Sequence, residues 1–218
     1  MKKMKNLFIL LMLTPMLAMA QGLNEQGASL EALVPQGWEH QEATGDLNKD
    51  GLPDLVIIAT PNHKDKILVR DDGYEINMNT PQLAIYFGKQ GGGYKLFKQY
   101  PNLIPARDEY CIVETTLEVT DRGALRLGVS MFMTAGSADT GGPTYTFRFQ
   151  NGDFFLIGKD EMEFSRYSGK ATEVSENYLT WKRQQKDFNM FRDNDSEVRE
   201  KWTRLKRRPL QRLGDFNL

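Results

Sequence analysis

Residues 45–59 read GDLNKDGLPDLVIIA, and this stretch decides the architecture around it. Its second half, Leu55 to Ala59, is apolar at every position, which is typical of a central strand buried on both faces. Its first half alternates oxygen-bearing side chains with other residues and places Gly51 where the chain must bend sharply. We therefore expect a tight polar loop that leads directly into a buried strand.

The polar loop has the spacing of a cation site. Oxygen side chains occupy its first, third, fifth and ninth positions, and the seventh residue offers a backbone carbonyl. Calcium takes roughly six to eight oxygens, and alternate residues of a curled loop can all point at one ion. The alternative is a turn that Asp, Asn and Gly build without metal, but its carboxylates would then repel one another. The pattern favours a Ca²⁺ loop over residues 46–54.

At its start the loop resembles an EF-hand, but Ile57 stands at the twelfth position, where that family has a glutamate. Because a strand follows, residues 38–60 resemble more closely the calcium hairpin of integrin-α-type repeats, also called FG-GAP or VCBS repeats. Only one copy is present, without a Phe-Gly or Gly-Ala-Pro pair, so a complete propeller is not expected. The resemblance implies that Ca²⁺ staples two strands of one sheet and is held by Asp46, Asn48, Asp50 and Asp54 through their side chains and by Leu52 through its carbonyl.

Short β-branched and aromatic runs separated by turn residues fill the middle of the chain, a pattern typical of antiparallel sheets. The fold class is therefore mainly β, with α+β as the alternative. Gly91 to Gly93 predicts a hairpin turn, Asn151 to Asp153 a second turn, and Met133 to Pro143 a long loop of the kind that carries binding function. The expected strands are 55–59, 82–87, 94–97, 111–119, 124–133, 144–150 and 154–158.

The N-terminus has the three parts of a secretory signal: early lysines, an apolar run from Leu7 to Leu17, and small residues up to Ala20. We expect cleavage before Gln21 and a soluble periplasmic or secreted product. The alternative, a membrane anchor, needs an apolar run of about 20 residues, which this one lacks. The expected organisation is a signal peptide (1–20), a polar stretch (21–30), a β-rich domain (31–182) and a basic C-terminal segment (183–218).

Charge and cysteine content narrow the function classes. The formal net charge is −1, which argues against a general nucleic-acid or membrane-surface binder. Cys111 is the single cysteine, so no intramolecular disulfide can form. It reads as a buried strand residue, and the alternative is a reactive thiol. The basic tail is expected to form either a short helix over Ser196 to Leu205 or an extended segment. Its charged surface is either a solvated face or a patch for phosphate-bearing partners such as glycolipid or polyanionic sugar.

The sequence contains few patterns that are typical of catalytic sites. His40 and His63 are the only histidines and do not have zinc spacing, and no serine lies in a Gly-x-Ser-x-Gly elbow. The first hypothesis is therefore a calcium-stabilised, non-catalytic domain that binds a protein or glycan in the cell envelope through the Met133 to Pro143 loop. Trp38, Tyr145 and Trp181 are candidate contacts, although core packing is the first expectation for each tryptophan. The alternative is an envelope hydrolase that uses paired carboxylates on glycan or peptide.

Overall fold

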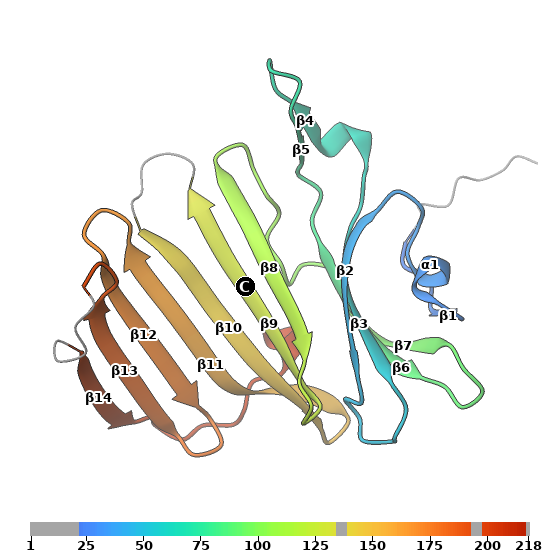
Figure 1. Ribbon diagram of the computed structural model, residues 1–218. Coiled ribbons are helices and arrows are strands. Elements are labelled where there is room, and N and C mark those ends of the chain that lie inside the picture. Colours follow the sequence, from blue (N-terminus) through green and yellow to red (C-terminus); the bar gives the residue numbers. More distant parts are fainter. Residues whose placement is uncertain (1–21, 134–138, 193–197, 217–218) are drawn as a thin grey trace, which may run out of the picture.

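The structure, a computed structural model, describes residues 22–133, 139–192 and 198–216 of the 218-residue chain. Strands dominate it, and their pairing throughout the described part is antiparallel (Figure 1). The prediction of a mainly β chain with antiparallel sheets is confirmed, and the sheets do not form a complete propeller. The predicted signal peptide, residues 1–20, lies outside the described residues.

One sheet has five strands in the order β1-β7-β6-β3-β2. It contains the predicted apolar strand as β3, an internal strand between β2 and β6, and β6 forms with β7 a hairpin that has the triple-glycine turn. A two-stranded ribbon projects from the sheet (Figure 1). The bounds are β1 Gln26–Gly27, β2 Glu39–Gly45, β3 Asp54–Thr60, β6 Gln82–Gly88 and β7 Tyr94–Tyr100, with ribbon strands β4 Ile67–Val69 and β5 Glu75–Asn77, helix α1 Leu30–Leu33 and 3-10 turn η1 Lys64–Lys66.

The second sheet has seven strands, and each strand pairs with the next one along the chain. This simple meander curves into a half-barrel (Figure 1). Its strands are β8 Cys111–Val119, β9 Ala124–Met133, β10 Asp139–Gln150, β11 Asp153–Ser165, β12 Lys170–Asn177, β13 Lys182–Asn189 and β14 Arg199–Arg204, followed by the 3-10 turn η3 Leu213–Asp215.

The main core lies between the two sheets. Alternate residues of β3 and β6 face alternate residues of β8, β9 and β10, as expected when strand side chains point to opposite faces in turn. Phe147, Phe154 and Leu125 are among its fully buried members. The other face of the five-stranded sheet, with Ile57 and Tyr86, packs on α1 and the N-terminal segment. Strand β3 is therefore buried on both faces, as its sequence predicts.

The two sheets also meet along the edges β2 and β8. Thr115 on β8 donates a hydrogen bond to the Gln41 side chain on β2, with oxygen atoms 3.2 Å apart. Further along the same edge, a Cβ added to Gly45 would lie 2.5 Å from Cγ1 of Val119. Glycine is therefore needed where the loop-bearing end of β2 crosses the end of β8.

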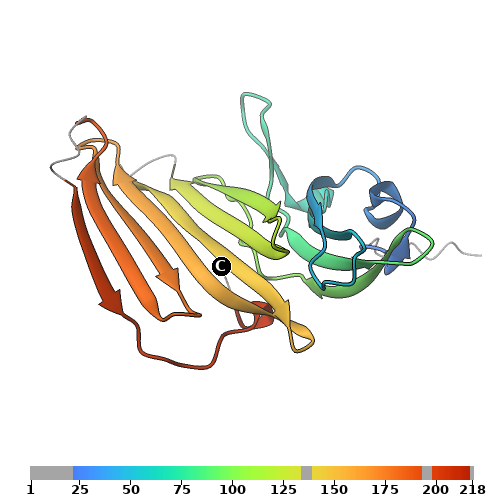
Figure 2. The ribbon, with the colours of Figure 1, turned by 60° about the horizontal axis from the view of Figure 1, so that its bottom comes forward.

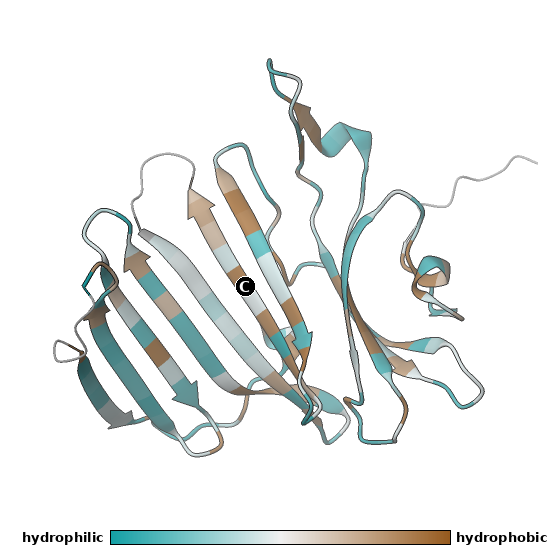
Figure 3. Cartoon of the chain, in the orientation of Figure 1, coloured by the Kyte–Doolittle hydropathy of each residue, from teal (hydrophilic) through white to brown (hydrophobic). Residues whose placement is uncertain are grey.

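The outer part of the seven-stranded sheet extends beyond this core. Strand β14 is exposed at all six positions, and β12 has a single buried residue, Ala171. Figure 3 shows that β13 and β14 are mostly polar. In the described residues, the outer strands therefore depend on backbone pairing and cross-strand contacts rather than on a second sheet packed against them.

The basic C-terminal segment forms part of this sheet. Of the two expectations for this segment, the extended one is confirmed and the helix over Ser196 to Leu205 is not: residues 199–204 are strand β14, paired with β13, and residues 193–197 lie outside the described residues. The open edge of β13 supplies partners for the backbone of β14, which outweighs local helix propensity. After β14 the chain runs back beneath the sheet (Figure 2), and Leu213 is fully buried in the main core.

The predicted long loop over Met133 to Pro143 is also corrected. Residues 139–143 belong to β10, and residues 134–138 lie outside the described residues. Strand β11 likewise runs to Ser165, well past the predicted end at residue 158. Both extensions pair with each other, from Asp139 opposite Ser165 inward. Cys111 is half-buried on β8 and packs against the main core.

Candidate functional site

The polar loop over residues 46–54 joins β2 to β3 and is closed by its own backbone amides. Oδ1 of Asp46 accepts hydrogen bonds from the amides of Lys49 at 2.7 Å and Asp50 at 3.2 Å, and Oδ2 accepts one from Gly51 at 3.1 Å. Lys49 and Gly51 have positive φ angles of 66° and 84°. The first carboxylate of the motif therefore organises the bend.

Asn48 and Asp50 bond to each other and to the backbone. Nδ2 of Asn48 donates to Oδ2 of Asp50 at 2.9 Å, and the Asp50 amide donates to Oδ1 of Asn48 at the same distance. Oδ1 of Asp50 accepts a bond from the amide of Leu52 at 2.8 Å. These residues are exposed or half-buried, so solvent and ions reach them.

Asp54 is different because its side chain is completely buried. Oδ2 accepts hydrogen bonds from the amides of Leu47 at 2.9 Å and Asn48 at 3.3 Å, and Oδ1 accepts one from Gly88 at 2.9 Å. Burial raises the pKa of Asp54, and repulsion from Asp50 adds to this, while the three amides act in the opposite direction. The carboxylate ties the loop to the end of β6.

The loop is also anchored in the core and on the second sheet. Leu47 is 1% exposed and belongs to the main core between the sheets. A Cβ added to Gly123, in the β8–β9 turn, would lie 2.3 Å from the Asp46 carbonyl oxygen and 2.3 Å from Nζ of Lys49. The loop therefore packs closely on the turn of the other sheet, and whatever stabilises the loop also stabilises the contact between sheets.

The calcium prediction fits these side chains in part. Asp46, Asn48 and Asp50 bring oxygens to one short loop, and each carboxylate has more lone pairs than it uses on amides. In the described residues, however, no three Asp, Glu, His or Cys side chains gather at one point as metal ligands do. Asp54 serves three amides and is turned into the protein. Calcium at this loop stays a prediction.

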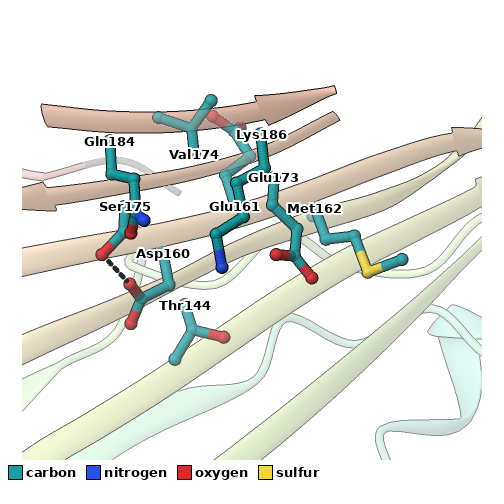
Figure 4. A pocket seen from close by; sticks show the side chains of 10 residues that line it. Thr144, Asp160, Glu161, Met162, Glu173, Val174, Ser175, Gln184 and Lys186 are labelled. Carbon is teal, nitrogen blue, oxygen red and sulfur yellow. Dashed lines mark hydrogen bonds between the residues drawn. The ribbon is translucent and has the colours of Figure 1, made fainter. Parts of the chain in front are cut away.

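A second candidate site lies on the seven-stranded sheet, on the face turned away from the core, which we call the open face. Its central row crosses five strands as consecutive cross-strand partners, Thr144, Asp160, Ser175, Gln184 and Trp202. A neighbouring row runs through Met162, Glu173, Lys186 and Glu200. These rows bring together residues up to 58 positions apart in the sequence, and Figure 4 shows most of their side chains from close by.

The two rows border a shallow groove of about 230 Å³. Within it, Oγ of Ser175 donates to Oδ1 of Asp160 at 2.7 Å (Figure 4). Asp160 also lies 3.8 Å from the Arg126 guanidinium, and its side chain is 52% exposed. Gln184 donates to Oε1 of Glu200 at 2.9 Å. The groove thus offers hydroxyl, amide and carboxylate groups that are oriented by one another and still reach solvent.

The core-facing side of the same strands has a different character. There Lys159 pairs with Glu161 at 2.8 Å, and Arg183 pairs with Glu176 at 3.4 Å. Thr172 donates to Asp187 at 2.9 Å. Charges on that side are largely paired within the protein, whereas those of the open face remain available to a ligand.

The aromatic residues considered as contacts lie mainly in the interior. Trp38 is 7% exposed and packs below α1 with the ring of His63 at its edge. Tyr145 packs on Phe216, with ring centroids 5.6 Å apart, and Trp181 packs on Tyr178 at 5.9 Å. Core packing, the first expectation for the tryptophans, is confirmed for Trp38. The exposed tryptophan is Trp202, which the sequence reasoning did not single out.

Comparison with family models, curated proteins and solved structures finds no match for this chain. In the described ranges, no helix has the length and apolar character needed to cross a membrane. The geometry of the loop and of the open face is therefore the basis for any functional conclusion.

Proposed function

We propose that this protein is a non-catalytic domain that binds a glycan on the open face of its seven-stranded sheet. The observation that carries this proposal is the central row, in which Thr144, Asp160, Ser175 and Gln184 stand side by side across four strands and lead to the exposed Trp202. Adjacent strands are about 4.8 Å apart, so the row extends over about 19 Å. It could contact several sugar rings at once.

The composition of the row favours a glycan over a protein partner. The cores of protein interfaces are depleted in Lys, Glu, Asp and Ser, and these residue types surround the groove, as Lys186, Glu173, Asp160 and Ser175. Sugar hydroxyls both donate and accept hydrogen bonds, which matches a surface of amides, hydroxyls and carboxylates. An aromatic ring beside such groups can cover the apolar face of a sugar.

Binding is favoured over hydrolysis by the openness of the groove. A glycoside hydrolase needs one carboxylic acid that holds its proton near neutral pH, usually through burial. Asp160 is half exposed and lies 3.8 Å from the Arg126 guanidinium. Glu173 is only partly covered. Neither carboxylate has the enclosed environment of an acid catalyst.

The proposal includes two predictions made from the sequence, which concern export and calcium. The protein is exported after removal of residues 1–20, and a calcium ion is held by Asp46, Asn48, Asp50, the Leu52 carbonyl and Asp54. The ion supplies positive charge among the loop carboxylates, and it stabilises the loop that packs on the β8–β9 turn. Support comes from the oxygen spacing and from the position of the loop between the sheets.

Titration calorimetry of the purified protein against neutral and acidic oligosaccharides tests the binding function. Gln184→Ala removes an amide of the central row, and we expect a loss of affinity of about tenfold. Gln185→Ala is the matched control, because Gln185 is the next residue of β13 and faces the other side, where it bonds to Asp187. The proposal is wrong if no glycan binds, or if both variants lose affinity equally.

A further inference from the structure

Two cations stand directly opposite each other at the outer margin of the open face. Lys182 on β13 and Arg204 on β14 are Cα partners in the antiparallel pair. Like charges in this position destabilise a sheet, because their Cβ atoms are only about 5 Å apart. Among the described residues, neither has an acidic side chain within 4.0 Å. The repulsion between them is therefore not offset within the described protein.

Trp202 lies beside this pair on the same face, two residues before Arg204 on β14. The residue is 58% exposed, and its indole nitrogen donates to Glu200, which also accepts the bond from Gln184. The ring therefore has a fixed orientation while most of its surface remains in water. Lys182, Trp202, Thr203 and Arg204 border a surface hollow of about 290 Å³.

We propose that this hollow binds an acidic sugar residue of the glycan, with the sugar ring on Trp202 and its anionic group between Lys182 and Arg204. The inference rests on the proposed function, and it names the class of sugar bound at the outer end of the central row. The carboxylate, sulfate or phosphate of the sugar offsets the repulsion between the two cations. Charge-assisted hydrogen bonds to such groups are about twice as strong as neutral ones.

The surrounding charge supports an acidic glycan over a nucleic acid. On the open face, β13 and β14 carry Lys182, Lys186 and Arg204 against the single acid Glu200, so positive charge predominates at this margin. The adjoining groove, however, carries Asp160 and Glu173. These carboxylates repel a backbone with a phosphate at every residue, but they accept hydrogen bonds from the hydroxyl groups of a neighbouring neutral sugar.

Calorimetry with three probes tests the inference: a hyaluronan octasaccharide for carboxylates, a heparin octasaccharide for sulfates, and a neutral chitin hexasaccharide. Lys182→Gln and Arg204→Gln should each weaken binding of an acidic probe about tenfold and leave binding of the neutral probe unchanged. Trp202→Ala should weaken both. Lys201→Gln is the charge-matched control, because Lys201 is exposed on β14 and faces the opposite side. We expect it to change affinity less than about twofold.

Several results would overturn the inference. If Lys201→Gln weakens acidic probes as much as Lys182→Gln does, binding follows general charge rather than the hollow. Binding of a single-stranded DNA octamer with the same affinity as the acidic oligosaccharides would likewise show that binding follows general charge. If neutral probes bind through Gln184 with no preference for acidic ones, the proposed glycan function stands and this inference fails. If acidic probes bind through the hollow while Gln184→Ala has no effect, the inference stands and the groove proposal fails.

Discussion

The backbone amide of Gly88, at the end of β6, lies 2.9 Å from Oδ1 of Asp54 and donates a hydrogen bond to it. The other oxygen of Asp54 accepts hydrogen bonds from the amides of Leu47 and Asn48. A Cβ added to Gly88 would lie 2.5 Å from the carbonyl oxygen of Pro53, so this approach requires glycine. Asp54, which the sequence singles out by its metal-ligand spacing, thus holds the start of β3, the loop and the end of β6 together.

Replacing Asp54 should destabilise the protein with or without calcium. Asp54→Ala leaves three amides without an acceptor in a buried place, and we expect the free energy of unfolding to fall by about 3 kcal/mol or more. Urea unfolding in the presence of a chelator measures this. Asp46→Asn is the comparison, because Asp46 also accepts three amides but is only half-buried, so water can replace lost bonds and the effect should be below about 1 kcal/mol under the same conditions. Equal effects would contradict the role assigned to Asp54.

Calcium should raise the melting temperature. For a dissociation constant of about 1 mM, typical of extracellular modules, 10 mM calcium adds about 1.4 kcal/mol of stability. For a chain of this size that is a shift of about 3–6 °C. Differential scanning fluorimetry of chelator-treated protein measures it, with Asp50→Ala expected to remove the shift. An equal shift in Asp50→Ala, or none in the wild type, would exclude a calcium ion at this loop.

Leu47 connects the loop to the core, so shortening its side chain should strongly destabilise the protein. Leu47→Ala removes a side chain that is 1% exposed and packs between the sheets. We expect a loss of about 2–5 kcal/mol in the free energy of unfolding. Leu52→Ala provides a matched change in the same loop at a partly exposed position, with an expected loss below about 1 kcal/mol. The two unfolding midpoints in urea should therefore be well separated.

Alkaline pH should weaken the packing of the N-terminal segment. Burial raises the pKa of Tyr86 to about 12, and its hydroxyl donates to the Asn24 carbonyl at 3.0 Å. The folded state holds this proton more tightly than the unfolded state, whose tyrosine pKa is about 10. The resulting stability is fully present below pH 10 and is lost as pH rises through about 12. Urea unfolding between pH 9 and pH 12 should show a steeper decline for the wild type than for Tyr86→Phe.

Acid should release the ring of Trp202. Hydrogen bonds from Gln184 and Trp202 lower the pKa of Glu200, so its carboxylate stays charged to below the usual value of 4.5. Protonation below that pH removes an acceptor from the indole. The difference in fluorescence between wild type and Trp202→Phe should be constant from pH 8 to pH 5 and change at lower pH. In Glu200→Gln the change should be absent, and its persistence there would exclude Glu200 as the group responsible.

The inner strands could be predicted because they carry a local signal. Leu55 to Ala59 and the β6–β7 hairpin have apolar runs and turn glycines, and the structure has strands there. Strands β12 to β14 carry no such signal, since KRQQKDFN is mostly polar and half-buried, REKWTR is exposed at every position, and both lack apolar alternation. Without that alternation, the sequence of residues 199–204 leaves a helix and an extended segment as alternatives.

The two candidate sites also differ in how much of each can be predicted from a local stretch of sequence. The loop lies within nine consecutive residues, so its spacing is visible in the sequence, but the bond from Gly88 to Asp54 depends on a strand 34 residues away. The open face is assembled by strand register across β10 to β14. No single segment of the sequence carries that pattern. An aromatic residue within a charged strand, such as Trp202, is the one local sign that could have pointed to it.

The exposure of strand β14 at every position also has a consequence for amide hydrogen exchange. Strands without apolar burial open at a smaller free energy than those in a core, so protection should decrease stepwise from β9 towards β14. The hollow and Trp202 would then belong to the segment of the sheet that separates first and re-forms most often. A ligand that bridges β13 and β14 would slow exchange there while leaving β3 and β6 unchanged.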